Sequence, residues 1–158
     1  MLPTVDETED AEASRIHTSG LLRIKMYSAS NLLSADSNGL SDPYVKISSA
    51  GIEKKTSTKR KTLNPEWHET IELHGTLSNF LQQGLTLKFM DWDLGSRDDP
   101  LGTLTVPLER LREQDEEKYV DWPLPTQGTA TFDVTWIPHA KPKSMLNKMA
   151  SSMTTSRE

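Results

Sequence analysis

Five aspartates in two short segments are the residues of this chain best suited to chemistry. They lie in the polar stretches 36–44 and 91–102, which also carry Ser, Asn and Gly. Carboxylates gathered in one place repel one another unless a cation lies among them. Calcium takes about 6–8 oxygen ligands, often from flexible loops. The two segments therefore predict calcium coordination by a set of acids: Asp36, Asp42, Asp91, Asp93 and Asp99.

Other chemistries fit these residues less well. The first segment is not an EF-hand loop, because its glycine is at the fourth position and no Glu closes it at the twelfth. The Asp-Thr-Gly and Asp-Ser-Gly motifs of aspartic proteases, a phosphate-binding glycine loop and a nucleophilic serine motif are all absent. We therefore expect no enzyme activity. Asp, Asn, Ser and Gly are also ordinary turn residues, although turns alone do not require five acids at this spacing.

The negative charge of the chain is concentrated at this acidic set. The net charge is −5, with −4 in residues 1–19, −4 in residues 20–138 and +3 in residues 139–158. Without the five aspartates, residues 20–138 would carry +1. We expect such a concentration of charge to act on ligands and partners rather than on the fold.

The sequence also bears on compartment and membrane contact. It contains no cysteine, which is consistent with a cytoplasmic protein. Its apolar runs are far shorter than the roughly 20 residues needed to span a bilayer. Its N-terminus is acidic, where a signal peptide would be basic and then apolar. Any membrane contact is therefore expected to be peripheral.

One domain with two tails is the predicted organisation. Residues 1–19 have the composition of a disordered acidic tail, and residues 139–158 form a basic tail containing Ser and Met. Residues 20–138 alternate apolar and polar side chains with period 2, as in Leu22, Ile24 and Met26. Further strands are predicted around 45–47, 67–73, 85–90, 101–106, 119–122 and 129–136, with a helical turn or two near 108–112.

About eight short strands at this spacing predict an all-β fold, an eight-stranded antiparallel β-sandwich. The loops of a sandwich cluster at its two ends. The two acidic segments can therefore lie at the same end. Trp92 is expected to be partly exposed beside them, and the other three tryptophans are expected in the core: Trp67, Trp122 and Trp136.

The ordered motifs of residues 20–138 resemble those of the C2-domain family. The resemblance covers about three quarters of the chain and rests on these segments: Ala29-Ser30-Asn31-Leu32, Asp36 to Val45, Thr62-Leu63-Asn64-Pro65-Glu66-Trp67, Asp91 to Asp99, and Leu101-Gly102. The chain looks similar to the C2 domains of tricalbins and extended synaptotagmins, and its calcium loops resemble those of conventional protein kinase C. The resemblance implies the C2 fold with type II-like topology, in which the last strand fills the place of an extra N-terminal strand. It also implies that the five aspartates hold two or three calcium ions.

The resemblance further implies two groups of lipid contacts. Tyr44, Lys46 and Lys55 match a cluster on the concave sheet face that binds phosphoinositide headgroups in some family members. The alternative for these residues is an ordinary solvated sheet face. The second group lies on the loops: Asn38 and Arg60 match phosphatidylserine contacts of conventional protein kinase C, while Ser96 replaces a Thr and Leu94 an Arg at such positions. Leu94 and Leu40 are instead expected as apolar loop tips, with ordinary loop packing as the alternative, and Arg97 adds a nearby cation.

Calcium-dependent binding to anionic phospholipids, phosphatidylserine or phosphoinositides, is the predicted function. The domain would act as a membrane-targeting module that is cytoplasmic and becomes peripheral to the membrane on calcium binding. We expect a monomer that binds no nucleic acid, with a protein partner as a further possibility. Two alternatives stay open: a calcium-independent protein-interaction module, and the targeting fragment of a larger lipid-transfer or signalling protein.

Overall fold

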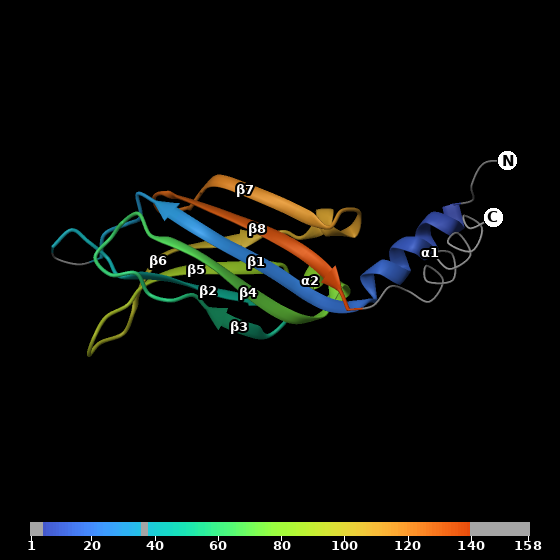
Figure 1. The fold of residues 1–158 in the computed structure, drawn as a ribbon, viewed down its shortest axis with the longest axis horizontal. Helices are drawn as coiled ribbons and strands as arrows, with labels where there is room; N and C mark the ends of the chain where they lie inside the picture. The colour runs from blue at the N-terminus through green and yellow to red at the C-terminus, as the bar shows by residue number, and fades with distance from the viewer. Residues whose placement is uncertain (1–4, 36–37, 140–158) are drawn as a thin grey trace, which may run out of the picture.

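The computed structural model describes residues 5–35 and 38–139. These residues form eight strands arranged as two antiparallel four-stranded sheets that pack face to face (Figure 1). The predicted eight-stranded antiparallel sandwich is confirmed. The elements in chain order are α1 Val5–Ile16, β1 Ser19–Ser30, β2 Pro43–Ser49, β3 Ile52–Lys55, β4 Glu66–Thr76, α2 Leu77–Gln83, β5 Leu85–Asp91, β6 Asp99–Val106, the 3₁₀ helix η1 Glu109–Arg112, β7 Glu116–Pro123 and β8 Thr129–Pro138.

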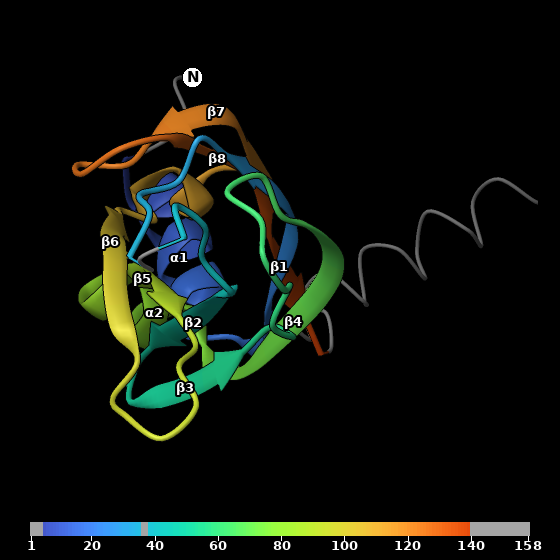
Figure 2. The ribbon, with the colours of Figure 1, turned by 90° about the vertical axis from the view of Figure 1, so that its left-hand side faces the viewer.

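The strand order agrees with the type II-like topology that the resemblance implies. One sheet has the order β4-β1-β8-β7 and the other β3-β2-β5-β6, and the view along the sandwich shows the two layers facing each other (Figure 2). The last strand, β8, lies between β1 and β7 and is antiparallel to both. It therefore occupies a central place in its sheet rather than an edge.

The core lies between the two sheets and follows the period-2 pattern. Leu22, Ile24 and Met26 of β1 are completely buried, and Phe132 and Trp136 of β8 are at most 2% exposed. Each such side chain stabilises the fold by about 1.5–3 kcal/mol when it is fully buried. Because successive strand residues point to opposite faces, the intervening polar residues face outward.

Helix α2 is a feature that strand-oriented pattern reading missed. Thr76 caps its N-terminus, because its side chain accepts a hydrogen bond from the Asn79 amide at 3.4 Å. Leu77, Phe80 and Leu81 are buried on one face of the helix. Their i, i+3, i+4 spacing is the amphipathic helical pattern, so the sequence did contain the signal. The turn predicted near residues 108–112 is present as η1.

The prediction of a disordered tail over residues 1–19 is wrong for most of that segment, which forms α1 and the start of β1. Arg15, in the last turn of α1, donates from Nε to the Leu111 carbonyl at 3.0 Å. Ile16 packs against the core. Composition favours disorder only where a segment has nothing to pack against, and here contacts with the sandwich hold the helix. The tail predicted over 139–158 lies, apart from His139, outside the described residues.

Candidate calcium- and membrane-binding site

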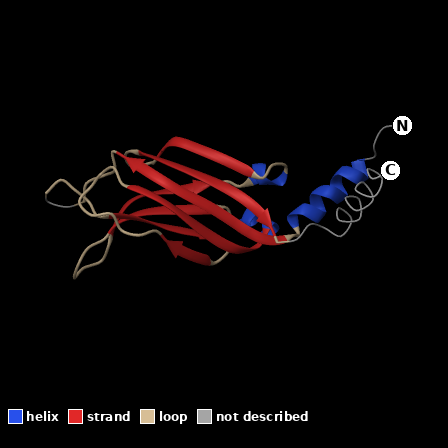
Figure 3. Cartoon of the chain, in the orientation of Figure 1, coloured by secondary structure: helices blue, strands red, loops and turns tan. Residues whose placement is uncertain are grey.

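Both acidic segments lie at the end of the sandwich that is opposite to α1 (Figures 1 and 3). The loop 31–42 connects β1 to β2, and the loop 92–98 connects β5 to β6. A third loop, 56–65, is attached to the first loop and the start of β2 through backbone hydrogen bonds from Lys59 to the Pro43 carbonyl and from Thr62 to the Ser41 carbonyl, each 2.9 Å long. The fold thus brings together at one end the two segments that supply the acids.

Asp42 and Asp91 are in direct contact. The backbone amide of Asp42 donates to Oδ1 of Asp91 at 2.6 Å, and the Trp92 amide donates to the Asp42 carbonyl at 2.9 Å. Asp91 is completely buried. These bonds join the residue before β2 to the last residue of β5, so the positions of both aspartates are set by the sheet.

The Asp42 carboxylate is also held by the third loop. Its Oδ1 accepts a hydrogen bond from the Lys61 amide at 2.7 Å. Lys61 has a positive φ of 51°, a conformation that is uncommon for a residue with a side chain. The local backbone is therefore shaped around this carboxylate, and the sequence alone did not indicate the contact.

Asp93 and Asp99 complete the acids on the second loop. Asp99 begins β6 and lies opposite Asp91 in the strand register, with its side chain exposed. Asp93 is half-buried, and its amide donates to Oδ1 of Asp98 at 3.0 Å. Four of the five predicted ligands therefore lie at the ends of neighbouring strands or in the loop that joins two of them.

The fifth predicted ligand, Asp36, lies outside the described residues. Among the residues that the structure does describe, no group of three or more His, Asp or Glu side chains is arranged to hold a metal ion. The donor chemistry still fits calcium, because the neighbouring acids supply hard carboxylate oxygens. The calcium ligand set therefore stays a prediction.

The described part of the first loop is tied down by Ser41. This buried hydroxyl donates to the Leu33 carbonyl at 3.0 Å and accepts from the Ala35 amide at 3.2 Å. Asn38 is exposed and uses its side-chain oxygen to accept from the Leu40 amide at 3.0 Å. The two described sides of the loop are thereby held together.

Asp98 has a role in the site that sequence reasoning did not assign. Besides the Asp93 amide, its carboxylate accepts a hydrogen bond from the Tyr44 hydroxyl. This bond is the main cause that lowers the pKa of Asp98, with smaller contributions from the Asp93 amide, Lys46 and Lys55. Burial, followed by the Asp98 bond, raises the pKa of Tyr44 to about 12. The pair is therefore a protonated phenol bonded to an ionised carboxylate.

The loop residues predicted to touch lipid are exposed at the same end. Leu94 is 82% exposed, and Ser96 and Arg97 beside it are exposed as well. The Arg60 guanidinium lies over the Trp92 ring, 5.2 Å from its centroid. Leu40, in contrast, is half-buried, so Leu94 is the better candidate for an apolar loop tip.

The structure corrects the prediction for one tryptophan. Trp67 and Trp136 are buried as expected, but Trp122 is 46% exposed. It lies on β7 after an irregularity in the register with β8 between Tyr119 and Trp122, where Asp121 has a φ of 49°. The extra residue puts Trp122 on the same side as Tyr119, whose ring centroid is 5.2 Å away, so its exposure follows from its place on the edge strand β7.

Three lysines form a row across the sheet face that carries Tyr44. Lys46 of β2 pairs with Lys55 of β3 on one side and with Lys88 of β5 on the other. Directly paired residues share a face, so the three ammonium groups lie on one surface, here called the basic row. Lys55 Nζ is also 5.8 Å from the centroid of the Tyr44 ring. The predicted Tyr44–Lys46–Lys55 cluster is thus brought together, and Lys88 is an addition that only the register reveals.

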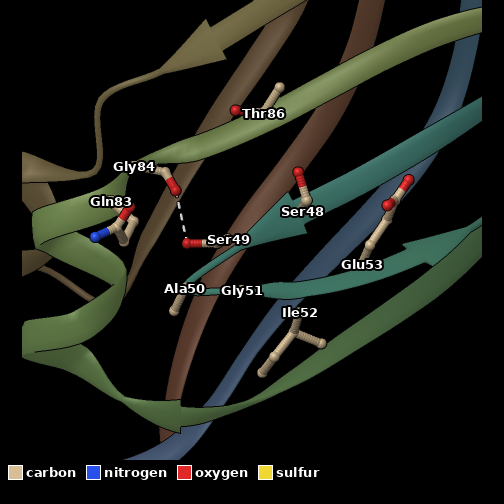
Figure 4. A pocket seen from close by; sticks show the side chains of 9 residues that line it. All are labelled: Ser48, Ser49, Ala50, Gly51, Ile52, Glu53, Gln83, Gly84 and Thr86. Carbon is tan, nitrogen blue, oxygen red and sulfur yellow. Dashed lines mark hydrogen bonds between the residues drawn. The ribbon is translucent and has the colours of Figure 1, made fainter.

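A shallow pocket lies at the other end of β2 and contains none of the predicted site residues. It is lined by the β2–β3 turn, the end of α2 and the start of β5 (Figure 4). Ser49 Oγ donates across it to the Gly84 carbonyl at 2.6 Å. This bond ties the turn to the end of α2.

The fold and the site define the class of the protein, an antiparallel β-sandwich domain with acidic loops at one end. Comparison with known proteins gives the family. The family model described as "C2 domain" matches residues 20–122. The chain belongs to the C2-domain family.

Relatives and solved structures agree with this assignment. Tricalbin-1 of Saccharomyces cerevisiae is 41% identical over 102 residues, which is 61% of this chain and 8% of that protein. Synaptotagmin-3 of Arabidopsis thaliana is 39% identical over 103 residues, 63% of this chain and 19% of that protein. A calcium-bound structure of two C2 domains of extended synaptotagmin 2 has a TM-score of 0.65 at 26% identity and covers 86% of this chain and 52% of that one. The chain therefore spans a small part of the length of these curated relatives.

The matches place the chain among C2 domains of the synaptotagmin and tricalbin type, which are in general membrane-targeting modules. In synaptotagmins such a domain is non-catalytic. Within the part of the chain that the structure describes, no helix is long and apolar enough to cross a bilayer.

Proposed function

We propose that this domain binds anionic phospholipid membranes in a calcium-dependent manner through the loops 31–42 and 92–98. Two or three calcium ions would be held by the five aspartates, and the domain would move from the cytoplasm to a membrane surface. The observation that carries the proposal is the direct contact of Asp42 with the buried Asp91, with Asp99 opposite in the register. Acids from both loops are thereby gathered at one end.

The charges of the loops support a switch in the sign of this surface. Without calcium, the acids repel an anionic membrane. Calcium reverses that charge, and lipid phosphate oxygens can complete its coordination shell, because calcium accepts up to about eight oxygen ligands. Arg60 and Arg97 add about 1 kcal/mol each near an anionic surface. The relative with calcium bound, extended synaptotagmin 2, is consistent with this reading.

The exposed leucine gives the loops an apolar contact as well. Leu94 is 82% exposed at the loop tip, where it can enter the acyl boundary. Asn38 and Ser96 lie exposed on the loops and can hydrogen-bond headgroups. The proposed contact thus combines metal coordination, basic side chains and one apolar anchor.

Liposome co-sedimentation of an Asp91→Asn, Asp93→Asn double variant tests this proposal. We expect the variant to lose calcium-dependent binding to vesicles of phosphatidylcholine with phosphatidylserine. Glu113→Gln is the control and should bind as the parent does, because Glu113 is exposed and precedes Gln114, whose carbonyl accepts from Arg15 of α1 at the opposite end of the sandwich. Because Asp91 is buried, an Asp93→Asn, Asp99→Asn variant repeats the test at less buried positions. Unchanged binding by both double variants would refute the mechanism.

The basic row supports a second contact, with phosphoinositide headgroups. Like charges directly opposite each other destabilise a sheet, so Lys46 between Lys55 and Lys88 gains from a bound anion. The Tyr44 ring lies on the same face, with Lys55 Nζ 5.8 Å from its centroid. Binding that persists in chelator and depends on these lysines would support this second contact. Binding to a protein in chelator, with no vesicle binding, would favour the protein-interaction alternative.

A further inference from the structure

Asp98 lies where the acidic loop meets the basic row. One of its oxygens accepts from the Asp93 amide at 3.0 Å, and the other accepts from the Tyr44 hydroxyl. Tyr44 belongs to β2, two residues before Lys46, and Lys55 Nζ lies over its ring. A single carboxylate therefore connects the proposed calcium loop to the proposed headgroup surface.

The charge of Asp98 acts on the same groups that a phosphate would use. The Tyr44 side chain that donates to Asp98 lies on the face of the basic row, with Lys55 Nζ 5.8 Å from its ring centroid, and Lys46 and Lys55 contribute in the same direction to the lowered pKa of Asp98. The Tyr44 hydroxyl is already donated to Asp98. An anionic headgroup bound to Lys46 and Lys55 would thus be repelled by the Asp98 carboxylate. It could not accept a hydrogen bond from the Tyr44 hydroxyl while that group donates to Asp98.

We propose that Asp98 is a built-in anion that restrains headgroup binding to the basic row, and that a cation in the acidic loops relieves this restraint. Asp98 directly precedes Asp99 and is bonded to Asp93, so a cation held by these two acids would offset its charge. The relief has a thermodynamic consequence, because coupling between two binding sites is reciprocal. Headgroup binding to the row should then strengthen calcium binding to the loops. The inference rests on the proposed function for the calcium step, but the restraint itself does not require calcium.

The test compares Asp98→Asn with Glu53→Gln. Glu53 is exposed on β3, two residues from Lys55, and its charge also raises the pKa of Tyr44. The control therefore removes one negative charge beside the same lysines without touching the Tyr44–Asp98 bond. Binding is measured to phosphatidylcholine vesicles containing a phosphatidylinositol bisphosphate, in chelator and in calcium. Competition by soluble inositol hexakisphosphate separates headgroup recognition from general attraction to a membrane.

Asp98→Asn should bind these vesicles about fivefold more tightly in chelator, the equivalent of about 1 kcal/mol per charge near the surface. The enhancement by calcium should shrink by the same factor. Glu53→Gln should change binding equally in both conditions and leave the enhancement unaltered. Equal behaviour of the two variants, or no change for Asp98→Asn in chelator, would overturn the inference.

The failure of this inference can be told apart from the failure of the proposed function. If the parent protein shows no calcium-dependent binding to phosphatidylserine vesicles, the calcium mechanism is wrong, while the chelator comparison still tests the restraint. If Asp98→Asn does not fold, Tyr44→Phe breaks the same hydroxyl bond. That variant should also lose part of the calcium enhancement, and an unchanged enhancement would count against the restraint.

Discussion

The backbone amide of Asp42 donates to the carboxylate of Asp91 at 2.6 Å, although the two residues are far apart in the sequence. The contact fixes the start of β2 against the end of β5 and gathers acids of two loops. Asp91→Asn keeps an oxygen acceptor and should fold with near-parent stability, whereas Asp91→Ala leaves the Asp42 amide unpaired. A lost buried partner costs about 1–3 kcal/mol. Thermal unfolding in chelator measures the stability of both variants. Equal stability of the two would show that the bond from the Asp42 amide does not stabilise the fold.

The loop tip should act as an apolar anchor. Leu94→Ala is expected to weaken calcium-dependent vesicle binding by about tenfold, because full burial of a leucine is worth about 1.5–3 kcal/mol. Its stability should not change, since the side chain is 82% exposed. Val120→Ala on β7, where Val120 is 69% exposed, is the control. A vesicle titration that cannot distinguish the two variants would exclude insertion of Leu94.

The basic row should recognise headgroups through its paired lysines. Lys55→Gln and Lys88→Gln are each expected to reduce phosphoinositide binding by about 1 kcal/mol, and the loss should diminish at high salt. Lys54→Gln is a matched control on the same strand, because Lys54 Nζ instead donates to the Glu72 carbonyl at 2.7 Å. If Lys54→Gln lowers binding as much as Lys55→Gln, the row has no special role.

Gly128 supports the turn between β7 and β8. It has a φ of 88°, and a Cβ there would overlap the carbonyl oxygens of Ser30 and Asn31. Gly128→Ala should lower the free energy of unfolding by more than about 1 kcal/mol. Gly51 has a similar φ of 79°, but an added Cβ there would have open space around it. Gly51→Ala therefore isolates the contribution of backbone strain to the loss of stability. Chemical denaturation should show the larger loss for Gly128→Ala.

The sheet pattern could be predicted from sequence because alternation reports burial directly. Leu22, Ile24 and Met26 are predicted inward and are completely buried. Helix α1 could not be predicted, because it depends on contacts such as that of Arg15 with Leu111, which is distant in sequence. The exposure of Trp122 depends on its place on the edge strand β7, which no local pattern encodes.

The candidate site was predictable in its residue types but not in its connections. Spacing of the acids indicates their shared chemistry, and the fold gathers four of the five at neighbouring strand ends. The bond from Tyr44 to Asp98 and the place of Lys88 beside Lys46 require the strand register. Asp98 resembles an ordinary loop acid in the sequence, since nothing local connects it to β2.

Calcium-dependent membrane binding is tested by co-sedimentation of the unaltered domain with phosphatidylcholine vesicles, with and without phosphatidylserine, in calcium and in chelator. The domain should pellet with the phosphatidylserine-containing vesicles only in calcium, and added salt should weaken the binding. Equal binding in calcium and in chelator, or no binding in either, would contradict the account.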